Sequence, residues 1–127
     1  MGTRILIVDD DPDVREMLHT ALGSIAGVEC AEAESAAQAL DVAARGVVPD
    51  LAVVDLLMPG EDGFSLCRAL RSRYGNRVAL CVLSGRIYQG DFRQALSIGV
   101  DAYLAKPVEL DRLLDEVKGL LNRSGNA

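Results

Sequence analysis

The sequence predicts an α/β domain, a doubly wound parallel sheet of five strands with five helices on its two faces. Five short apolar runs alternate with five stretches in which apolar residues recur every three or four positions. The loops between these elements are short, and hydrophobic residues make up 50% of the 127 positions. Strands joined through helices by short loops run parallel with right-handed crossovers, so the helices cover both faces of the sheet.

The first strand and the first helix form a well-marked pair. Residues 4–8 are an apolar run that ends at three consecutive acids. Asp11 is suited to cap a helix, because Pro12 follows it and proline is tolerated at the first helical position. Apolar residues at helical spacing within residues 14–25 then indicate a helix with one buried face, and Gly27 ends the unit.

The second and third strands are also marked by their neighbours. We expect a strand at residues 28–33, after which Ser35 can cap a helix that stops at Gly46. Residues 51–55 are four apolar residues and an acid, the pattern of a buried parallel strand that ends at a loop. Beyond this loop, apolar residues within 64–74 mark one side of a third helix.

The last two units follow the same plan. Residues 78–83 are a fourth apolar run that ends at a polar loop. Residues 87–99 are less regular, so their apolar residues predict a helix only in the later half. A fifth strand at residues 101–105 leads to a strongly periodic last helix at residues 110–121.

These elements fit one domain of ordinary size. We assign residues 1–122 to the domain and residues 123–127 to a polar tail or the start of a linker. Five strands that alternate with five helices suit the flavodoxin-like strand order 2-1-3-4-5.

Charge and cysteine content exclude several function classes. The net charge of -6, from 13 basic and 19 acidic residues, argues against direct contact with nucleic acid, which requires a basic patch. The three cysteines are odd in number and lack metal-ligand spacing, so we expect buried free thiols in a reducing compartment. No apolar run approaches the ~20 residues of a membrane helix. Together these features predict a cytoplasmic protein that contacts no membrane.

Polar residues stand at the carboxyl ends of the predicted strands. They are Asp9 and Asp10 after the first strand, Asp55 at the end of the third, Ser84 after the fourth and Lys106 after the fifth. In a parallel sheet these ends share one edge, and ligands bind there. Because the first strand neighbours the third in the expected order, three carboxylates should lie close together. Such a cluster is costly unless a cation neutralises it, and its oxygen ligands suit Mg²⁺ or Mn²⁺.

A carboxylate in such a cluster can also attack phosphorus and form an aspartyl phosphate. Asp55 is central among the strand ends and is the candidate phosphoacceptor, with Asp9 and Asp10 as candidate metal ligands. Ser84 can donate a hydrogen bond to a phosphoryl oxygen, and Lys106, one of two lysines in the chain, can pair with another.

These motifs resemble the receiver domain of response regulators in two-component signal transduction. The resemblance covers the chain from about Arg4 to Leu121. Its matching segments are Ile5–Pro12, Asp55, Met58–Pro59, Asp62–Gly63, Ser84 and Lys106–Pro107. It implies a signalling domain rather than an enzyme, in which Asp55 takes a phosphoryl group from the phosphohistidine of a sensor histidine kinase or a phosphotransfer protein.

The resemblance implies further roles. It assigns Mg²⁺ to Asp10, Asp55, the backbone carbonyl of Leu57 and, largely through water, Asp9. Ser84 and Tyr103 look like a switch pair that changes the surface made by the fourth helix, fifth strand and fifth helix. That surface would control an output partner or output domain. The sequence leaves open whether a phosphorylation-dependent dimer also forms through it.

The main alternative is a Mg²⁺-dependent phosphohydrolase with an aspartyl nucleophile on a related sheet. That class is expected to carry D-x-D-x-[TV] after the first strand, whereas residues 9–13 read Asp-Asp-Asp-Pro-Asp, and no room is left for a cap insertion. Nucleotide or flavin binding is a third hypothesis, but the chain contains neither G-x-G-x-x-G nor G-x-x-x-x-G-K-[ST].

Other charged residues receive structural interpretations. Arg68, Arg71 and Arg73 are interpreted as a solvated face of the third helix. His19 has no second His or Cys at ligand spacing and is interpreted as a surface or rim residue. Asp11 is expected to cap a helix rather than bind metal.

Overall fold

The computed structural model describes residues 2–45, 48–58, 60–85 and 89–123. Its main sheet is parallel, with the strand order β2-β1-β3-β6-β7. The strands of this sheet are β1 (Thr3–Val8), β2 (Val28–Ala33), β3 (Leu51–Asp55), β6 (Ala79–Ser84) and β7 (Ala102–Ala105). When only these five are counted, the order is the predicted 2-1-3-4-5, and the flavodoxin-like fold class is confirmed.

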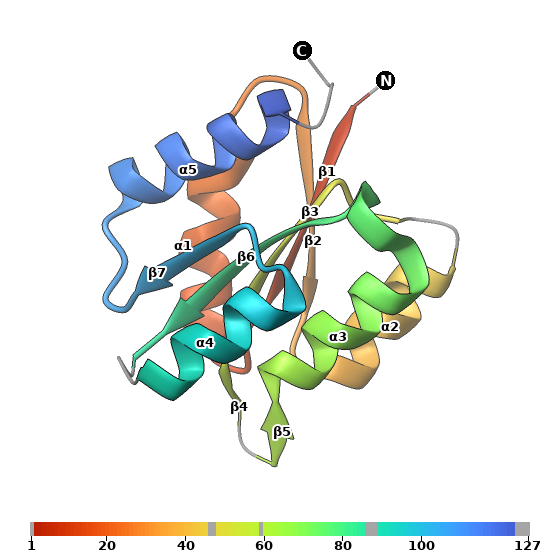
Figure 1. Ribbon diagram of the computed structural model, residues 1–127. Coiled ribbons are helices and arrows are strands. Elements are labelled where there is room, and N and C mark those ends of the chain that lie inside the picture. The colour runs from red at the N-terminus through yellow and green to blue at the C-terminus, as the bar shows by residue number, and fades with distance from the viewer. Residues whose placement is uncertain (1, 46–47, 59, 86–88, 124–127) are drawn as a thin grey trace.

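Within the described residues, five α-helices cover the sheet. They are α1 (Pro12–Gly23), α2 (Ala36–Ala44), α3 (Gly63–Tyr74), α4 (Gln89–Ile98) and α5 (Leu110–Arg123), and a short 3₁₀ helix, η1, spans Gly75–Arg77. Figure 1 shows α1 and α5 on one face of the sheet and α2, α3 and α4 on the other. None of these helices is long and apolar enough to cross a membrane. The domain boundary at residue 122 stays a prediction.

The core has two layers, one on each side of the sheet. Along β1, Ile5 and Ile7 pack into the layer under α1 and α5, while Leu6 and Val8 pack into the layer under α2, α3 and α4. All four side chains are at most 1% exposed, because successive residues of a strand point to opposite faces and both faces are covered. This double burial explains why β1 is apolar throughout instead of alternating.

The predicted helix caps are confirmed at both tested positions. Asp11 caps α1 by accepting a hydrogen bond from the backbone N–H of Asp13, and Pro12 is the first helical residue. Ser35 caps α2 by accepting from the N–H of Gln38 at 3.1 Å. The predicted stop at Gly46 falls outside the described residues.

Several element boundaries differ from the prediction. Helix α1 ends at Gly23, because both the backbone N–H and the hydroxyl of Ser24 bond to the Ala21 carbonyl. Strand β6 begins at residue 79 because η1 occupies residues 75–77. Strand β7 begins after Asp101, whose carboxylate accepts a hydrogen bond from the backbone N–H of Leu80 at 2.8 Å.

A small hairpin forms where the sequence predicted only a loop. Strands β4 (Leu57–Met58) and β5 (Glu61–Asp62) pair antiparallel, outside the main sheet. Gly60 in the turn has φ 71°, a left-handed conformation that glycine adopts without steric cost. The hairpin directly follows β3 and leads into α3, so it folds beside the carboxyl end of the central strand.

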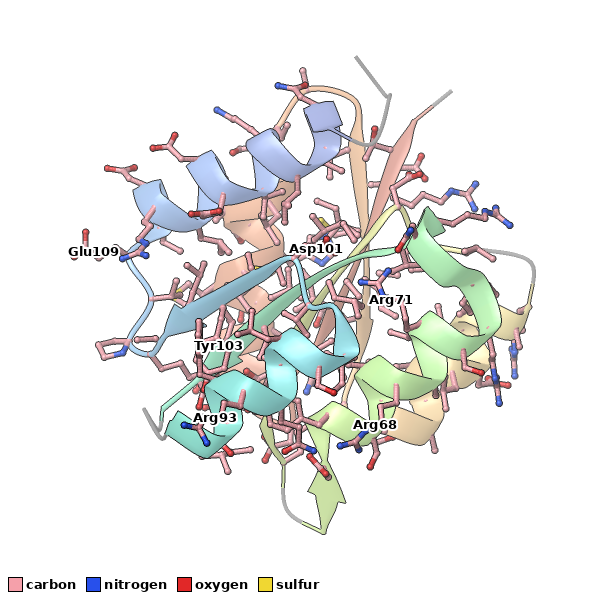
Figure 2. All side chains as sticks on the ribbon, in the orientation of Figure 1. Arg68, Arg71, Arg93, Asp101, Tyr103 and Glu109 are labelled. Carbon is pink, nitrogen blue, oxygen red and sulfur yellow. The ribbon has the colours of Figure 1, made fainter. Side chains whose placement is uncertain are left out.

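The prediction that Arg71 lies on a solvated helix face is wrong, whereas Arg68 and Arg73 are exposed as expected. The Arg71 side chain is 18% exposed and pairs with Asp101 at 3.2 Å. Its guanidinium also donates to the carbonyl oxygens of Gly75, Val78 and Gly99. Figure 2 shows Arg71 reaching from α3 toward Asp101 at the start of β7. Arg71 therefore ties the end of α3 to the adjoining strands.

Helix α4 is confirmed, but it begins earlier than the later half of its segment and its apolar residues do not share one buried face. Ala95 is 3% exposed, whereas Phe92 and Leu96 are 51% and 62% exposed. The ring of Phe92 lies edge-on to Tyr103 of β7, with centroids 6.1 Å apart. An apolar surface is thus left uncovered beside β7.

The three cysteines are free, as expected, although Cys30 is only half-buried. Burial raises the pKa of Cys67 and of Cys81 to about 12. Both buried thiols therefore stay protonated at neutral pH and act as apolar core groups.

Candidate functional site

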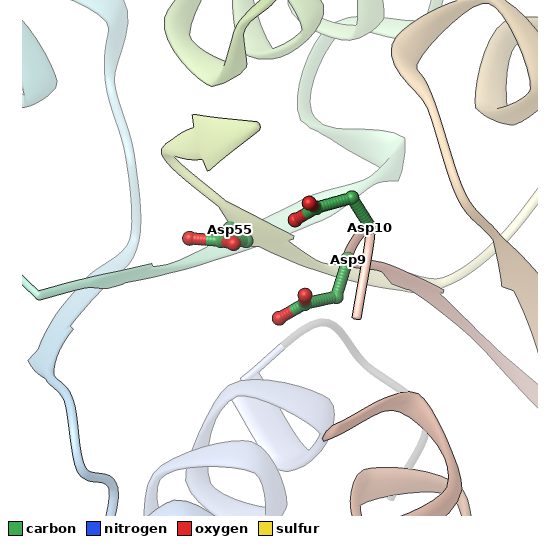
Figure 3. A group of neighbouring side chains, drawn as sticks. All are labelled: Asp9, Asp10 and Asp55. Atoms are coloured by element: carbon green, nitrogen blue, oxygen red, sulfur yellow. The ribbon is translucent and has the colours of Figure 1, made fainter. Parts of the chain in front are cut away.

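Three carboxylates meet at the carboxyl ends of β1 and β3 (Figure 3). Val8 lies beside Val54 in the strand register, so the acids that follow these two residues end at the same level. One carboxylate oxygen from each of Asp9, Asp10 and Asp55 lies within 4.8 Å of the other two. Asp9 and Asp55 are 1% and 4% exposed, whereas Asp10 is exposed. The predicted acidic cluster is present, and one side of it is open to solvent.

Lys106 bridges the two buried carboxylates. Its Nζ lies 3.0 Å from Asp9 Oδ2 and 3.2 Å from Asp55 Oδ2. Its backbone N–H donates to the Ser84 carbonyl at 2.8 Å, which holds the residue at the end of β7. Burial alone lowers the pKa of Lys106, but its hydrogen bond to Asp9 and the charges of both carboxylates outweigh burial and raise the pKa above its usual value. The ammonium group therefore remains charged at neutral pH.

Asp55 lies in surroundings that disfavour its charged form. Burial raises the pKa of Asp55, and the nearby charge of Asp9 raises it further. Lowering effects come from the backbone N–H of Leu57, which donates to Asp55 Oδ1 at 3.1 Å, and from Lys106, but the pKa stays above its usual value. One lysine does not fully compensate the cluster. A divalent cation on the open side would supply the missing charge, and carboxylate oxygens suit a hard cation.

Gly63 allows α3 to approach the end of β3. A Cβ at this position would lie 2.7 Å from the Asp55 carbonyl oxygen and 2.8 Å from the Leu56 Cα, which are both backbone atoms. The preceding residue, Asp62, caps α3 by accepting a hydrogen bond from the N–H of Phe64 at 2.9 Å. The segment Asp62–Gly63 thus fixes the start of α3 against the backbone of the candidate phosphoacceptor.

The remaining predicted site residues lie on the adjoining strands. Ser84 is fully buried at the end of β6, the strand that pairs with β3. Leu57 follows Asp55 in the hairpin, with its side chain 43% exposed. Tyr103 is half-buried on β7, opposite Val82, and its ring contacts α4. Side-chain contacts therefore join Asp9, Asp55 and Lys106. Ser84 contacts Lys106 through the backbone, and Tyr103 lies on β7, which pairs with the strand of Ser84.

Arg15 was missed by the sequence reasoning. Its Nη1 donates to the backbone carbonyl of Asp9 at 2.7 Å, so it contacts the chain within the acidic cluster. One signal was available: basic residues near a helix N-terminus oppose the helix dipole, so an arginine there suggests a specific anionic or carbonyl partner.

Comparisons with known proteins assign the fold and the site to a family. A family model for the response regulator receiver domain matches residues 5–118. The response regulator MprA of Mycobacterium sp. (strain KMS) is 40% identical over 124 residues, which are 98% of this chain and 53% of MprA. The transcriptional regulatory protein PrrA of Mycobacterium tuberculosis is 43% identical over 123 residues, 97% of this chain and 52% of PrrA. The chain thus spans about half the length of these relatives.

Solved structures agree with this result. The crystal structure of a CheY-like response regulator receiver domain protein from Methanospirillum hungatei JF-1 matches with a TM-score of 0.91 and 26% identity, over 99% of this chain and 98% of that one. A response regulator receiver protein from Pseudomonas putida matches with a TM-score of 0.86 and 29% identity, over 94% and 98% of the two chains.

The family match includes every strand end that contributes to the acidic site. It identifies a signalling domain and does not support the phosphohydrolase that the sequence left as an alternative. The acidic cluster is consistent with the divalent metal site that is typical of receivers. On these findings the chain belongs to the response regulator receiver domains of two-component phosphorelay signalling.

Proposed function

We propose that Asp55 accepts a phosphoryl group from the phosphohistidine of a sensor histidine kinase or a phosphotransfer protein. The observation that carries the proposal is the placement of Asp55: its carboxylate is buried, belongs to the three-carboxylate cluster and lies 3.2 Å from Lys106. In the transfer, an Asp55 oxygen bonds to phosphorus, the bond from phosphorus to the imidazole nitrogen breaks, and its electron pair stays on that nitrogen. Lys106 offsets the charge of the phosphoryl oxygens, and Ser84 donates a hydrogen bond to one of them.

Mg²⁺ is the proposed cofactor, with Mn²⁺ as a substitute. The proposed ligands are Asp10, Asp55, the backbone carbonyl of Leu57 and, largely through water, Asp9. The donor set fits because all its atoms are oxygens and because one side of the cluster faces solvent, where water can complete the coordination. When bound there, the ion would supply positive charge that neutralises the phosphoryl oxygens.

Ser84 and Tyr103 are the proposed switch pair. In the unphosphorylated protein the Tyr103 ring supports the exposed Phe92 of α4. Movement of the Ser84 hydroxyl toward a phosphoryl group would make room for the ring to turn inward, which would remove that support. The surface of α4, β7 and α5 would then change and bind an output domain, an output protein or a second copy of the chain.

Phosphorylation by a small donor tests the proposal directly. With acetyl phosphate and Mg²⁺, the protein should gain the mass of one phosphoryl group in intact mass spectrometry, and Asp55→Asn should gain none. Asp41→Asn, which removes an exposed carboxylate paired with Arg45 on α2, is the matched control and should be labelled like the wild type. Chelation of the metal should abolish labelling. Labelling of Asp55→Asn would overturn the phosphoacceptor assignment, and rapid multiple turnover of the donor would favour the phosphohydrolase over a signalling domain.

A further inference from the structure

Arg15 connects helix α1 to the backbone of the acidic cluster. Its side chain is 15% exposed, and its Nη1 donates a hydrogen bond of 2.7 Å to the carbonyl oxygen of Asp9. This short bond links a charged donor to the peptide group that joins Asp9 to Asp10. The guanidinium therefore lies one peptide away from the exposed carboxylate of the cluster.

Glu32 of β2 holds the other end of this arginine. Arg15 Nε lies 3.2 Å from Glu32 Oε1, while Glu32 Oε2 lies 2.7 Å from His19 Nδ1, one turn further along α1. Glu32 is paired with Ile7 in the strand register, two residues before Asp9. Because arginine presents its donors in a rigid planar fork, a contact at Nε fixes the direction of Nη1. Glu32 thus aims Arg15 at the Asp9 carbonyl.

Asp9 is held at every polar atom, whereas the Asp10 side chain depends on its backbone. Asp9 Oδ1 accepts from the N–H of Asp11 and Oδ2 contacts Lys106, while the Asp9 N–H donates to the Ala33 carbonyl. Among the described residues, no hydrogen bond or ion pair holds the Asp10 carboxylate. Because the peptide bond is planar, the orientation of the Asp9 carbonyl also fixes the position of the Asp10 Cα. The hydrogen bond from Arg15 is thus a restraint on where Asp10 points.

We propose that Arg15, aimed by Glu32, is a positioning residue for the divalent-cation site. It holds the peptide between Asp9 and Asp10 so that the Asp10 carboxylate faces Asp55. The inference rests on the proposed function, because it assumes that the cluster binds a divalent cation. Groups that orient metal ligands from outside the coordination sphere commonly contribute 10- to 100-fold to metal affinity.

Cation binding to the unphosphorylated protein tests this role without any transfer reaction. Isothermal titration with Mg²⁺, and Mn²⁺ binding followed by electron paramagnetic resonance, should show that Arg15→Met weakens binding about tenfold. Arg15→Lys keeps an N–H donor but loses the planar fork that Glu32 orients, so its affinity for the cation should lie between those of the wild type and Arg15→Met. The matched control is Arg45→Met, which removes an arginine from an exposed ion pair at the C-terminal end of α2 and should leave the affinity unchanged. The backbone amide resonance of Asp10 should shift in Arg15→Met and stay in place in Arg45→Met.

The outcomes separate this inference from the proposed function. Absence of cation binding by the wild type would overturn both. If a folded Arg15→Met binds Mg²⁺ as tightly as the wild type does, only the role of Arg15 is overturned. This holds even if that variant melts at a lower temperature. If Arg15→Met does not fold, the affinity of Arg15→Lys for Mg²⁺ is compared with that of the wild type instead, and equal affinities would overturn the role of Arg15. In an Asp10→Asn background, the loss of affinity caused by the Arg15 substitution should shrink, because Arg15 acts through Asp10.

Discussion

Asp55 carries a negative charge that the folded protein only partly compensates. Burial and the neighbouring Asp9 raise its pKa, while Lys106 and the N–H of Leu57 act in the opposite direction. A carboxylate in such surroundings costs stability, and the same surroundings leave it ready to take a cation or a phosphoryl group. At the level of this single residue, the requirements of function and of stability oppose each other.

Asp55→Asn should therefore increase the free energy of unfolding at neutral pH, by about 1 kcal/mol. The amide carries no charge, can still accept from the N–H of Leu57, and leaves Lys106 paired with Asp9. The folded state binds the Asp55 proton more tightly than the unfolded chain, so the ionised group costs stability above its folded pKa, and the cost vanishes as the pH falls toward the ordinary value of 3.8.

Urea denaturation of both proteins at several pH values measures this difference. The gain should be largest at neutral pH and should shrink in acid. Asp41→Asn, at an exposed position, should change stability little at any pH. A loss of stability in Asp55→Asn at neutral pH, or a gain that grows in acid, would contradict the argument.

The start of α3 is positioned by a close approach of two backbone segments. Gly63 touches the backbone of Asp55 and Leu56, and Asp62 caps the helix from the neighbouring hairpin strand. At the other end of α3, Arg71 binds carbonyl groups of η1 and of the segment before β7. The first turn of this helix is therefore held against the end of β3, near Leu57. Its last turn is held against η1 and the segment that precedes β7.

Gly63→Ala should destabilise the fold by about 2 kcal/mol, because the added Cβ meets backbone atoms that cannot turn aside. It should also weaken Mg²⁺ binding, since the strain falls on the backbone of Asp55. Gly119→Ala in α5 is the control: a Cβ there meets nothing within 4 Å, so the variant should gain about 1 kcal/mol from helix propensity. Urea denaturation and isothermal titration measure both effects. Equal stability of the two variants would show that α3 can retreat from β3 at no cost.

The molecule as a whole exposes apolar side chains unevenly. Both core layers are buried, yet Phe92 and Leu96 of α4 remain more than half exposed, and the Phe92 ring contacts Tyr103. Exposed large apolar residues that adjoin one another favour contact with another protein surface. Because Phe92 contacts Tyr103, the proposed switch residue, a movement of Tyr103 on phosphorylation would change this apolar surface.

Phosphorylation with acetyl phosphate and Mg²⁺ should therefore promote dimerisation through α4, β7 and α5. Sedimentation velocity should show a larger dimer fraction for the phosphorylated protein than for the unphosphorylated one. Leu96→Lys should reduce this fraction because it places a charge within the contact. Met17→Lys changes an exposed apolar residue of α1 and should have no effect. A phosphorylated wild type that stays monomeric would leave the surface to an output domain or output protein.

Much of this protein is predictable from local patterns. Helical periodicity, caps such as Asp11 and Ser35, and apolar runs that stop at acids identify the five strands and the five helices. Because parallel strands end on one edge, the same runs also predict that Asp9, Asp10 and Asp55 converge. These inferences succeed because each depends on the spacing of residues within a segment and on the single way in which short crossovers pack against a sheet.

The tertiary structure alone decided which partners the remaining side chains find. The sequence alone places Arg71 on the surface, yet its guanidinium binds the carbonyl of Val78 and that of Gly99, which is 28 residues further along the chain. In the sequence Arg15 is one of several charged residues of α1, yet in the structure it donates a hydrogen bond to the backbone of Asp9. Phe92 and Leu96 have the spacing of a buried helix face, yet both side chains are exposed. Periodicity tells which residues share a side of an element, but the group that lies opposite belongs to another element, whose distance and orientation are set only when the whole chain packs.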